Sequence, residues 1–201
     1  MKLAVIKYNA GNVQSVTYAL NRLGIEPILT DNAEEILAAD KVLFPGVGEA
    51  STAMKFLKEK GLDLLIPQLK QPTLGICLGL QLMCQHSEEN NTHCLGIFDI
   101  QVKKFAQQQM DASGMVYKVP QMGWNNVYDL QTPLFKGIDN NSYLYFVHSY
   151  YAELSTHTIA KTDYVNTFSA SLHRDNFYAA QFHPEKSGDI GAQLLKNFID
   201  L

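Results

Sequence analysis

The order of apolar and polar residues in the first half of the chain predicts strands that alternate with helices. Four short apolar runs have the length of buried strands, and four other segments carry apolar residues at helical spacing. The predicted strands are 3–7, 26–29, 41–44 and 73–76, and the predicted helices are 12–22, 33–39, 49–60 and 78–85. Asn12 is placed to cap the first helix, and Gly24 to end it. This alternation is typical of a parallel sheet.

The second half of the chain is richer in extended segments and turns. Its predicted strands are 97–105, 124–127, 143–147, 157–162, 168–172 and 178–182. Several are short enough for antiparallel pairing, 190–199 predicts an amphipathic helix, and 106–113 predicts an exposed loop. We therefore expect an α/β fold in which 1–201 form one domain. It has a mostly parallel central sheet with helices on both faces and antiparallel strands in the second half.

Composition and charge narrow the functional class. The net charge of -4 argues against a surface for nucleic acid or anionic membranes, because phosphate binding needs clustered Lys and Arg. No apolar run approaches the ~20 residues of a membrane span, and the apolar part of the N-terminus is too short for a signal peptide. The three cysteines, Cys77, Cys84 and Cys94, are not at metal-ligand spacing. We expect no metal, no disulfide and a cytoplasmic location.

The segment 72–81 carries the strongest chemical signal. It reads as a buried strand that ends in Cys77 and runs directly into a helix. Gly75 and Gly79 allow the sharp turn and the close approach of strand to helix. Such a turn exposes one side chain at the end of a sheet, where a thiol with a nearby base can attack a carbonyl group.

A partner for this thiol follows the predicted strand at 178–182. His183 and Glu185 are two residues apart and can face the same side of the chain. In open α/β sheets the carboxyl ends of strands line the ligand crevice, and both Cys77 and His183 follow predicted strands. Cysteine, histidine and glutamate can then supply nucleophile, base and a group that orients the base.

Each of these signals also has a plainer interpretation. A buried cysteine is usually a core residue, and we assign this role to Cys84, two helical turns beyond Cys77, and to Cys94. Glu89 can belong to a solvated helix end, and 149–150 to a strand end. The combination of the glycine-flanked cysteine with a histidine and a glutamate at a second strand end favours catalysis.

These residues match a known family. The segment 75–81, together with 183–185, resembles the motifs of the class I glutamine amidotransferases. The resemblance covers essentially the whole chain. Further motifs at 45–48, 120–125 and 146–151 are similar to the glutaminase subunits of imidazole glycerol phosphate synthases, which act in histidine biosynthesis.

The resemblance implies a reaction and a set of residues. Cys77 would attack the side-chain amide of glutamine, His183 supported by Glu185 would move the proton, and water would hydrolyse the glutamyl thioester. It implies no cofactor. The residues implied to stabilise the oxyanion are Leu78 and the loop residues Val47 and Gly48, and those implied to hold glutamine are Gln81, Glu89, Ser149 and Tyr150.

The resemblance also implies a partner. This would be a cyclase subunit with a (β/α)8 barrel, joined to the chain as a heterodimer. It would use the ammonia on a phosphorylated ribulosyl nucleotide to make imidazole glycerol phosphate and aminoimidazole carboxamide ribonucleotide. The candidate interface residues are Tyr8, Asn12, Trp124, Asn125 and Lys186. Trp124, the only tryptophan, has an alternative role as a core residue.

The chain departs from the family near its start, where Lys7 and Asn9 replace the usual Asp and Gly. Three other interpretations stay open beside the leading one. They are a glutaminase of another synthase, of the anthranilate or GMP type, a catalytically idle interaction subunit, and a cysteine hydrolase with a different substrate. The motifs at 45–48 and 122–125 argue against the first, and intact Cys77, His183 and Glu185 argue against the second.

Overall fold

The computed structural model describes residues 1–8, 13–111 and 113–201, so the predicted cap Asn12 lies outside the described residues. The strands are β1 (Leu3–Ile6), β2 (Ile28–Thr30), β3 (Lys41–Gly46), β4 (Thr73–Cys77), β5 (Cys84–Ser87), β6 (Thr92–His93), β7 (Phe98–Lys104), β8 (Gln121–Val127), β9 (Ser142–His148), β10 (Tyr150–Ala152), β11 (Thr158–Asp163), β12 (Thr167–Arg174) and β13 (Phe177–Ala180). The helices are α1 (Val13–Arg22), α2 (Ala33–Leu37), α3 (Ala50–Glu59), α4 (Leu62–Leu65), α5 (Leu78–Met83) and α6 (Gly188–Asp200). Short 3-10 turns are η1 (Ile66–Gln68), η2 (Glu89–Asn91), η3 (Pro133–Phe135) and η4 (Pro184–Lys186).

The central sheet has seven strands in the order β11-β12-β13-β4-β3-β1-β2. The strands β13, β4, β3, β1 and β2 are parallel, and β12 and β11 extend the sheet in antiparallel fashion. This confirms the predicted fold class. The strand β13, which comes late in the sequence, lies beside β4, so the two segments that carry the candidate catalytic residues are neighbours in the sheet.

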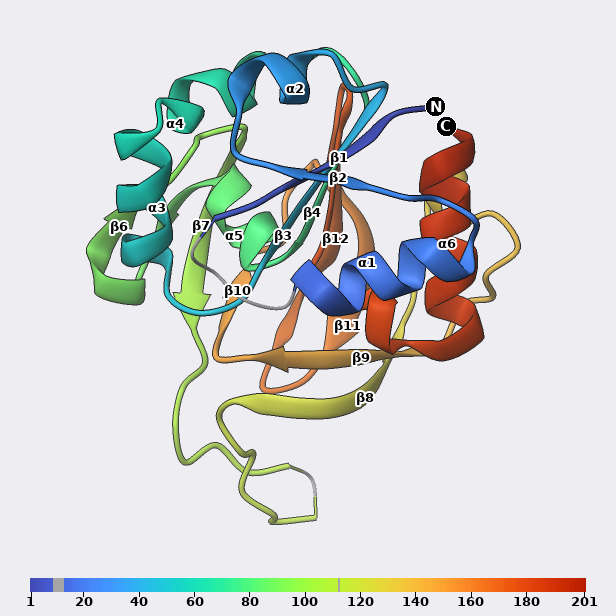
Figure 1. Cartoon of the computed structure of the whole chain (residues 1–201). Helices are drawn as coiled ribbons and strands as arrows, with labels where there is room; N and C mark the ends of the chain where they lie inside the picture. Colours follow the sequence, from blue (N-terminus) through green and yellow to red (C-terminus); the bar gives the residue numbers. More distant parts are fainter. Residues whose placement is uncertain (9–12, 112) are drawn as a thin grey trace.

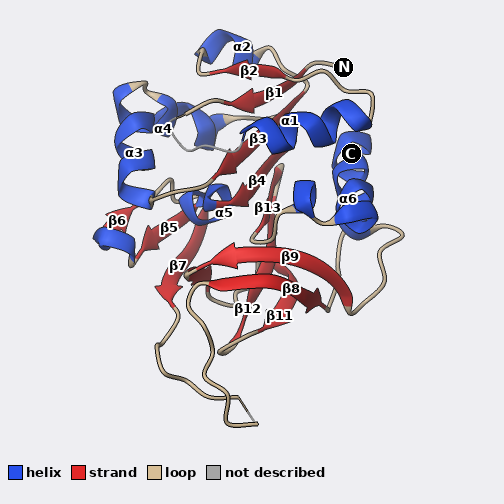
Figure 2. Cartoon of the chain, turned by 60° about the horizontal axis from the view of Figure 1, so that its bottom comes forward, coloured by secondary structure: helices blue, strands red, loops and turns tan. Residues whose placement is uncertain are grey.

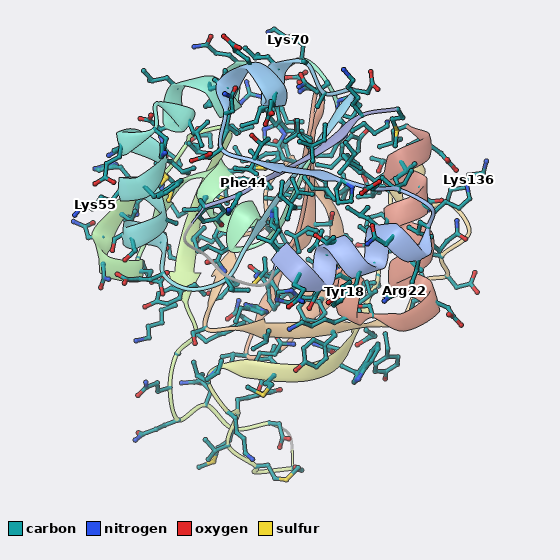
Figure 3. All side chains as sticks on the ribbon, viewed as in Figure 1. Tyr18, Arg22, Phe44, Lys55, Lys70 and Lys136 are labelled. Atoms are coloured by element: carbon teal, nitrogen blue, oxygen red, sulfur yellow. The ribbon has the colours of Figure 1, made fainter. Side chains whose placement is uncertain are left out.

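Helices cover both faces of this sheet. Figure 1 shows α3, α4 and α5 on one side of the strands and α1 and α6 on the other. The alternation of side chains along β1 builds a core on each side, because Ala4 and Ile6 pack with one apolar cluster and Leu3 and Val5 with the other. Phe44 lies in the interior, whereas the labelled lysines reach outward from the rim of the molecule (Figure 3).

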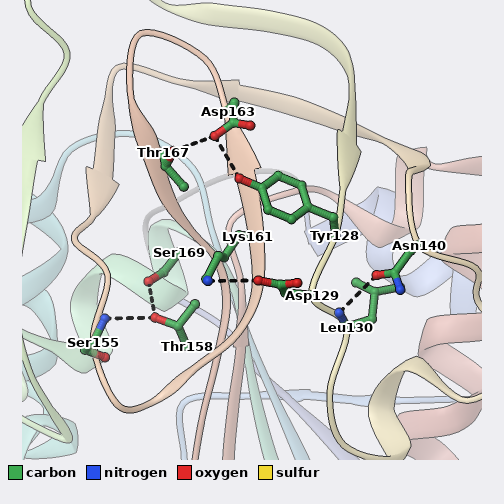
Figure 4. A network of polar contacts seen from close by, with 10 residues as sticks. All are labelled: Tyr128, Asp129, Leu130, Asn140, Ser155, Thr158, Lys161, Asp163, Thr167 and Ser169. Atoms are coloured by element: carbon green, nitrogen blue, oxygen red, sulfur yellow. Dashed lines mark hydrogen bonds and ion pairs between the residues drawn. The ribbon is translucent and has the colours of Figure 1, made fainter.

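Two smaller sheets complete the fold. One has the order β10-β7-β5-β6, and the other is the antiparallel pair β8–β9, which Figure 2 shows as a separate layer beside the central sheet. Polar contacts fix the end of β8 to the edge strand β11 (Figure 4). The Tyr128 hydroxyl donates to the Asp163 carboxylate at 2.9 Å, and Lys161 pairs with Asp129 at 2.8 Å. The pair β8–β9 is thereby held on the antiparallel edge of the central sheet.

The structure corrects two predicted boundaries. The strand at 41–44 does not end before Pro45 but continues to Gly46, pairing Pro45 with Ile76 and Gly46 with Cys77. Proline is tolerated there because the described β1–β3 ladder ends at Leu43, so the missing N–H breaks no bond of that ladder. In the described chain, no helix is both long and apolar enough to cross a membrane.

The predicted helix 78–85 is also too long. It ends at Met83, and Cys84 begins the strand β5 by pairing with Phe98. Cys84 is buried as predicted, but in a strand and not in a helix. The second sheet overrides the helical pattern here, because β5 pairs with β7 and β6 along its length. The short elements α4, β6 and β10 are also additions to the predicted set.

Candidate active site

Cys77 occupies a sharp turn between β4 and α5. Its backbone has φ 54° and ψ −106°, a region that costs a non-glycine residue about 1–3 kcal/mol. The glycines on either side make the turn compact. A Cβ placed on Gly79 would lie 1.9 Å from the carbonyl oxygen of Phe44, and one on Gly75 would lie 2.9 Å from Gly79. Strained backbone and close strand–helix packing therefore hold the Cys77 side chain at the end of the central sheet.

His183 follows β13, the neighbour of β4, and lies at the same end of the sheet. Its backbone N–H donates to Tyr145 O of β9 at 2.8 Å, and the Ser187 hydroxyl donates to its carbonyl oxygen at 2.6 Å. The imidazole Nδ1 lies 2.8 Å from Glu185 Oε1, and both side chains are buried. The two-residue spacing thus allows a contact between His183 and Glu185, and this contact orients the imidazole ring.

The surroundings of His183 favour its charged form. Burial alone lowers the pKa of the imidazole, but the Cys77 sulfur and the Glu185 carboxylate raise it to about 10. His183 Nε2 is buried and has no partner at hydrogen-bonding geometry within the described part of the chain. The nitrogen opposite the Glu185 contact is thus available for proton exchange with Cys77.

A cavity of about 370 Å³ opens beside Cys77. It brings together all the residues predicted for the oxyanion and for substrate, and its volume is within the range of small-molecule sites. Its lining residues are Val47, Gly48, Cys77, Leu78, Gln81, Glu89, Pro120, Val147, His148, Ser149 and Tyr150. His183 and Glu185 line a smaller adjoining space with Pro45, Gly46 and Val47.

Two of the residues predicted to hold glutamine have defined side-chain polar contacts in this cavity. Glu89 accepts the N–H of Ala50 at 2.7 Å, at the start of α3. Burial raises the pKa of the Glu89 carboxyl, against the lowering effect of this hydrogen bond. Gln81 is buried, and its amide donates to Tyr150 O at 2.9 Å. The cavity therefore presents both an acidic group and fixed amide dipoles.

The loop after β3 provides the candidate oxyanion donors. Gly46 pairs with Cys77 in the sheet, which places the following Val47 and Gly48 beside the Cys77 turn. Gly48 has φ +105°, a conformation that L side chains rarely adopt. The orientation of the Val47–Gly48 peptide thus depends on glycine at position 48.

Replacing Gly48 with valine is expected to lower turnover by about 100-fold, the usual cost of losing one oxyanion donor. No atom lies within 4 Å of a Cβ at this position, so the chain should still fold while the peptide changes orientation. Steady-state kinetics and thermal unfolding measure both effects. The matched control is Gly137→Val, which has φ +74°, equally open space and no place in the cavity. Unchanged turnover in Gly48→Val would remove this loop from the oxyanion site.

Two polar residues at the site escaped sequence reasoning. Gln181 lies fully buried against Cys77, and His148 lines the cavity with its Nδ1 2.7 Å from Tyr150 O. Burial lowers the pKa of His148 to about 4, so it is neutral at physiological pH beside the charged His183. Gln181 and His148 stand in or next to the motifs at 183–185 and 146–151, but spacing alone gave no reason to single them out.

The candidate interface residues are dispersed. Trp124 is 55% exposed on β8, which rules out its alternative role as a core residue, and its ring meets Tyr145 edge-on. The Lys186 ammonium lies 6.0 Å from the centre of the same Tyr145 ring. Asn125 donates to Asp163 O at 2.7 Å. Tyr8 is buried beneath Gly46 and only 6% exposed, and Asn12 lies outside the described residues.

The described residues contain no group of three or more His, Cys, Asp or Glu side chains that could hold a metal ion. The chemistry available to the described site is that of a thiol, an imidazole paired with a carboxylate, and backbone N–H groups. An α/β sheet that presents these groups at the turn between a strand and a helix defines an enzyme of the cysteine-nucleophile class, which transfers acyl groups through a thioester.

Comparison with known proteins gives the particular family. The model of "Glutamine amidotransferase class-I" matches residues 4–201. The imidazole glycerol phosphate synthase subunit HisH of Bacteroides fragilis (strain YCH46) is 58% identical over the whole of both chains, and that of Bacteroides thetaiotaomicron is 55% identical, again over the whole of both. A solved glutamine amidotransferase structure has a TM-score of 0.73 at 18% identity and covers 98% of this chain and 97% of its own. The chain belongs to the class-I glutamine amidotransferase family and, within it, to the HisH group.

Proposed function

We propose that this chain hydrolyses glutamine to glutamate and ammonia through a thioester on Cys77. The observation that carries the proposal is the convergence of Cys77 with the buried His183–Glu185 pair beside the cavity of Gln81 and Glu89. The whole of 1–201 acts as one glutamine amidotransferase domain in this proposal.

In the first step the Cys77 thiolate attacks the side-chain carbonyl carbon of glutamine. The charged His183 then gives its proton to the departing ammonia, and Glu185 keeps the ring oriented through Nδ1. Leu78 and the Val47–Gly48 loop donate backbone N–H groups to the oxyanion. Water, deprotonated by His183, hydrolyses the thioester and releases glutamate.

The cavity residues divide the recognition of glutamine between them. Glu89 suits the α-ammonium group, because its carboxylate is fixed at the start of α3 and faces the cavity. Gln81, Ser149 and Tyr150 bind the remaining polar groups.

The ammonia passes to a cyclase subunit with a (β/α)8 barrel, with which this chain forms a heterodimer. The HisH relatives carry the name of imidazole glycerol phosphate synthase, and their identity over the full length supports the same assembly here. The partner consumes ammonia to make imidazole glycerol phosphate and aminoimidazole carboxamide ribonucleotide in the cytoplasm. Trp124 and Lys186, which both approach Tyr145, form the proposed contact surface together with Asn125.

Glutamate release from glutamine by the purified chain tests the proposal. It is measured for the chain alone and for the chain with a cognate cyclase subunit and its nucleotide ligand, with the cyclase alone as the blank. We expect low activity alone and a large rise in the complex. No glutamate from folded protein in a demonstrated complex would point to an idle subunit or to another substrate.

Replacing Trp124 with alanine is expected to weaken binding to the cyclase by about 10–100-fold, as exposed aromatic anchors do at interfaces. Stability should stay within about 0.5 kcal/mol of the parent, since the ring is half exposed. Calorimetric titration with the partner and urea unfolding measure the two effects, and Leu64→Ala, also exposed but on α4, is the control. A loss of stability with unchanged partner affinity would show that the interface role is wrong.

A further inference from the structure

We propose that Gln181 is a further catalytic residue, whose side-chain amide donates a hydrogen bond to the Cys77 sulfur and stabilises its thiolate form. Gln81 fixes the direction of this amide. The inference rests on the proposed glutaminase function, because it assigns a role within the same reaction.

The contacts form a continuous chain from the cavity to the sulfur. Gln81 Nε2 donates to Tyr150 O at 2.9 Å and to Gln181 Oε1 at 3.1 Å. Gln181 Nε2 then lies 3.7 Å from Cys77 Sγ, within the range of hydrogen bonds to sulfur. Gln181 has no exposed surface, and Gln81 is 4% exposed. Neither amide can therefore satisfy its polar groups with bulk water.

A backbone carbonyl determines which groups donate and which accept along this series of hydrogen bonds. Tyr150 O can only accept, so the Gln81 side chain must present its NH₂ group there. The same nitrogen faces Gln181, whose side-chain oxygen must therefore accept the hydrogen bond. Turning the Gln181 amide over would set two NH₂ groups against each other in a buried site. The Gln181 NH₂ group is consequently left facing Cys77.

A donor that faces the sulfur favours the thiolate, because hydrogen bonding to a charged form stabilises that form. The neutral thiol has a hydrogen bond of its own, in which Sγ–H donates to Val147 O at 3.7 Å. Deprotonation removes this contact and leaves the Gln181 N–H as a fixed partner. The charged His183 stabilises the same state. Gln181 and His183 thus act together on one sulfur atom.

A purely structural role for Gln181 makes a different prediction. If the amide only fills the core, a methionine of similar length should alter stability and leave the reactivity of Cys77 unchanged. If it stabilises the thiolate, the pH dependence of that reactivity should move. The test is the rate of Cys77 alkylation by iodoacetamide from pH 5 to pH 10, with mass spectrometry of the peptides to separate Cys77 from Cys84 and Cys94.

In Gln181→Met the pH midpoint of Cys77 alkylation should rise by about one unit, so that the rate below the midpoint falls about tenfold. In Gln181→Glu, where a carboxylate replaces the donor, it should rise further. The control is Gln193→Met, which removes an amide on α6 that donates to Asn197 at 2.8 Å and is outside the cavity. Its midpoint should equal that of the parent chain.

Glutaminase kinetics in the complex provide the second readout. Gln181→Met should lower kcat about tenfold or more with KM changed little, because the sulfur and not the bound glutamine has lost its partner. An unchanged alkylation midpoint in a folded Gln181 variant would overturn the inference, whatever the kinetics. A shifted midpoint in a chain that never releases glutamate would uphold the inference about the sulfur and sink the proposed function. If Gln181→Met does not fold, Gln181→Leu, which also removes the donor without adding a charge, decides by the same midpoint.

Discussion

Changing Glu185 to glutamine is expected to lower kcat for glutamate release by about 10³–10⁴-fold while the chain stays folded. Glu185 Oε1 accepts the N–H of His183 Nδ1 at 2.8 Å, which leaves Nε2 to exchange a proton with Cys77. A glutamine can instead point its NH₂ group at Nδ1, which stabilises the tautomer that carries its hydrogen on Nε2. That tautomer cannot accept the thiol proton, and the neutral amide no longer stabilises the imidazolium.

The measurement is steady-state release of glutamate by the complex, with thermal unfolding of the same samples. Asp189→Asn is the matched control, because it makes the same change from carboxylate to amide at an exposed position in the first turn of α6. KM should change little, because Glu185 does not line the glutamine cavity. A Glu185→Gln variant within tenfold of the parent in kcat would mean that the buried pair does not orient the base.

The central sheet was predictable because its strands are short apolar runs bounded by turn residues. The run beginning at Leu3 and the run ending at Ile76 are completely buried, so their pattern is continuous and easily read. The predicted end of the helix 78–85 was wrong although the same kind of apolar run precedes it. Residues 78–83 are also buried throughout, and only the distant pairing of Cys84 with Phe98 converts the next residues into a strand. Local pattern carries no information about that partner.

The residues of the candidate site that follow strand ends could be predicted from the sequence. Cys77 and His183 were placed together because carboxyl ends of strands meet, and the parallel neighbours β4 and β13 provide that meeting. Gln181 was not found, since its two decisive contacts, with Gln81 and Cys77, span 100 and 104 residues of sequence. A buried glutamine at a strand end has no spacing signature, and only the folded chain reveals which atom it faces.

The second large effect concerns stability, and it arises at the tight turn between β4 and α5 that holds Cys77. Replacing Gly79 with alanine is expected to reduce the free energy of unfolding by about 3 kcal/mol or more, with loss of glutaminase activity. The added Cβ would lie 1.9 Å from the carbonyl oxygen of Phe44, a backbone atom of the central strand β3. This oxygen cannot move without displacing the strand that also carries Gly46 beside Cys77.

Urea unfolding of Gly79→Ala measures this loss, with Gly114→Ala as the control. Gly114 has φ +84° and open space around it, so an alanine there carries only the backbone penalty of about 1–2 kcal/mol. Gly79 has no positive φ, so Gly79→Ala carries no such backbone penalty, and its loss of stability comes from the clash between helix and strand. If Gly79→Ala costs no more than Gly114→Ala, α5 can withdraw from β3 at small cost. The close strand–helix contact is then not what fixes Cys77 at the end of the sheet.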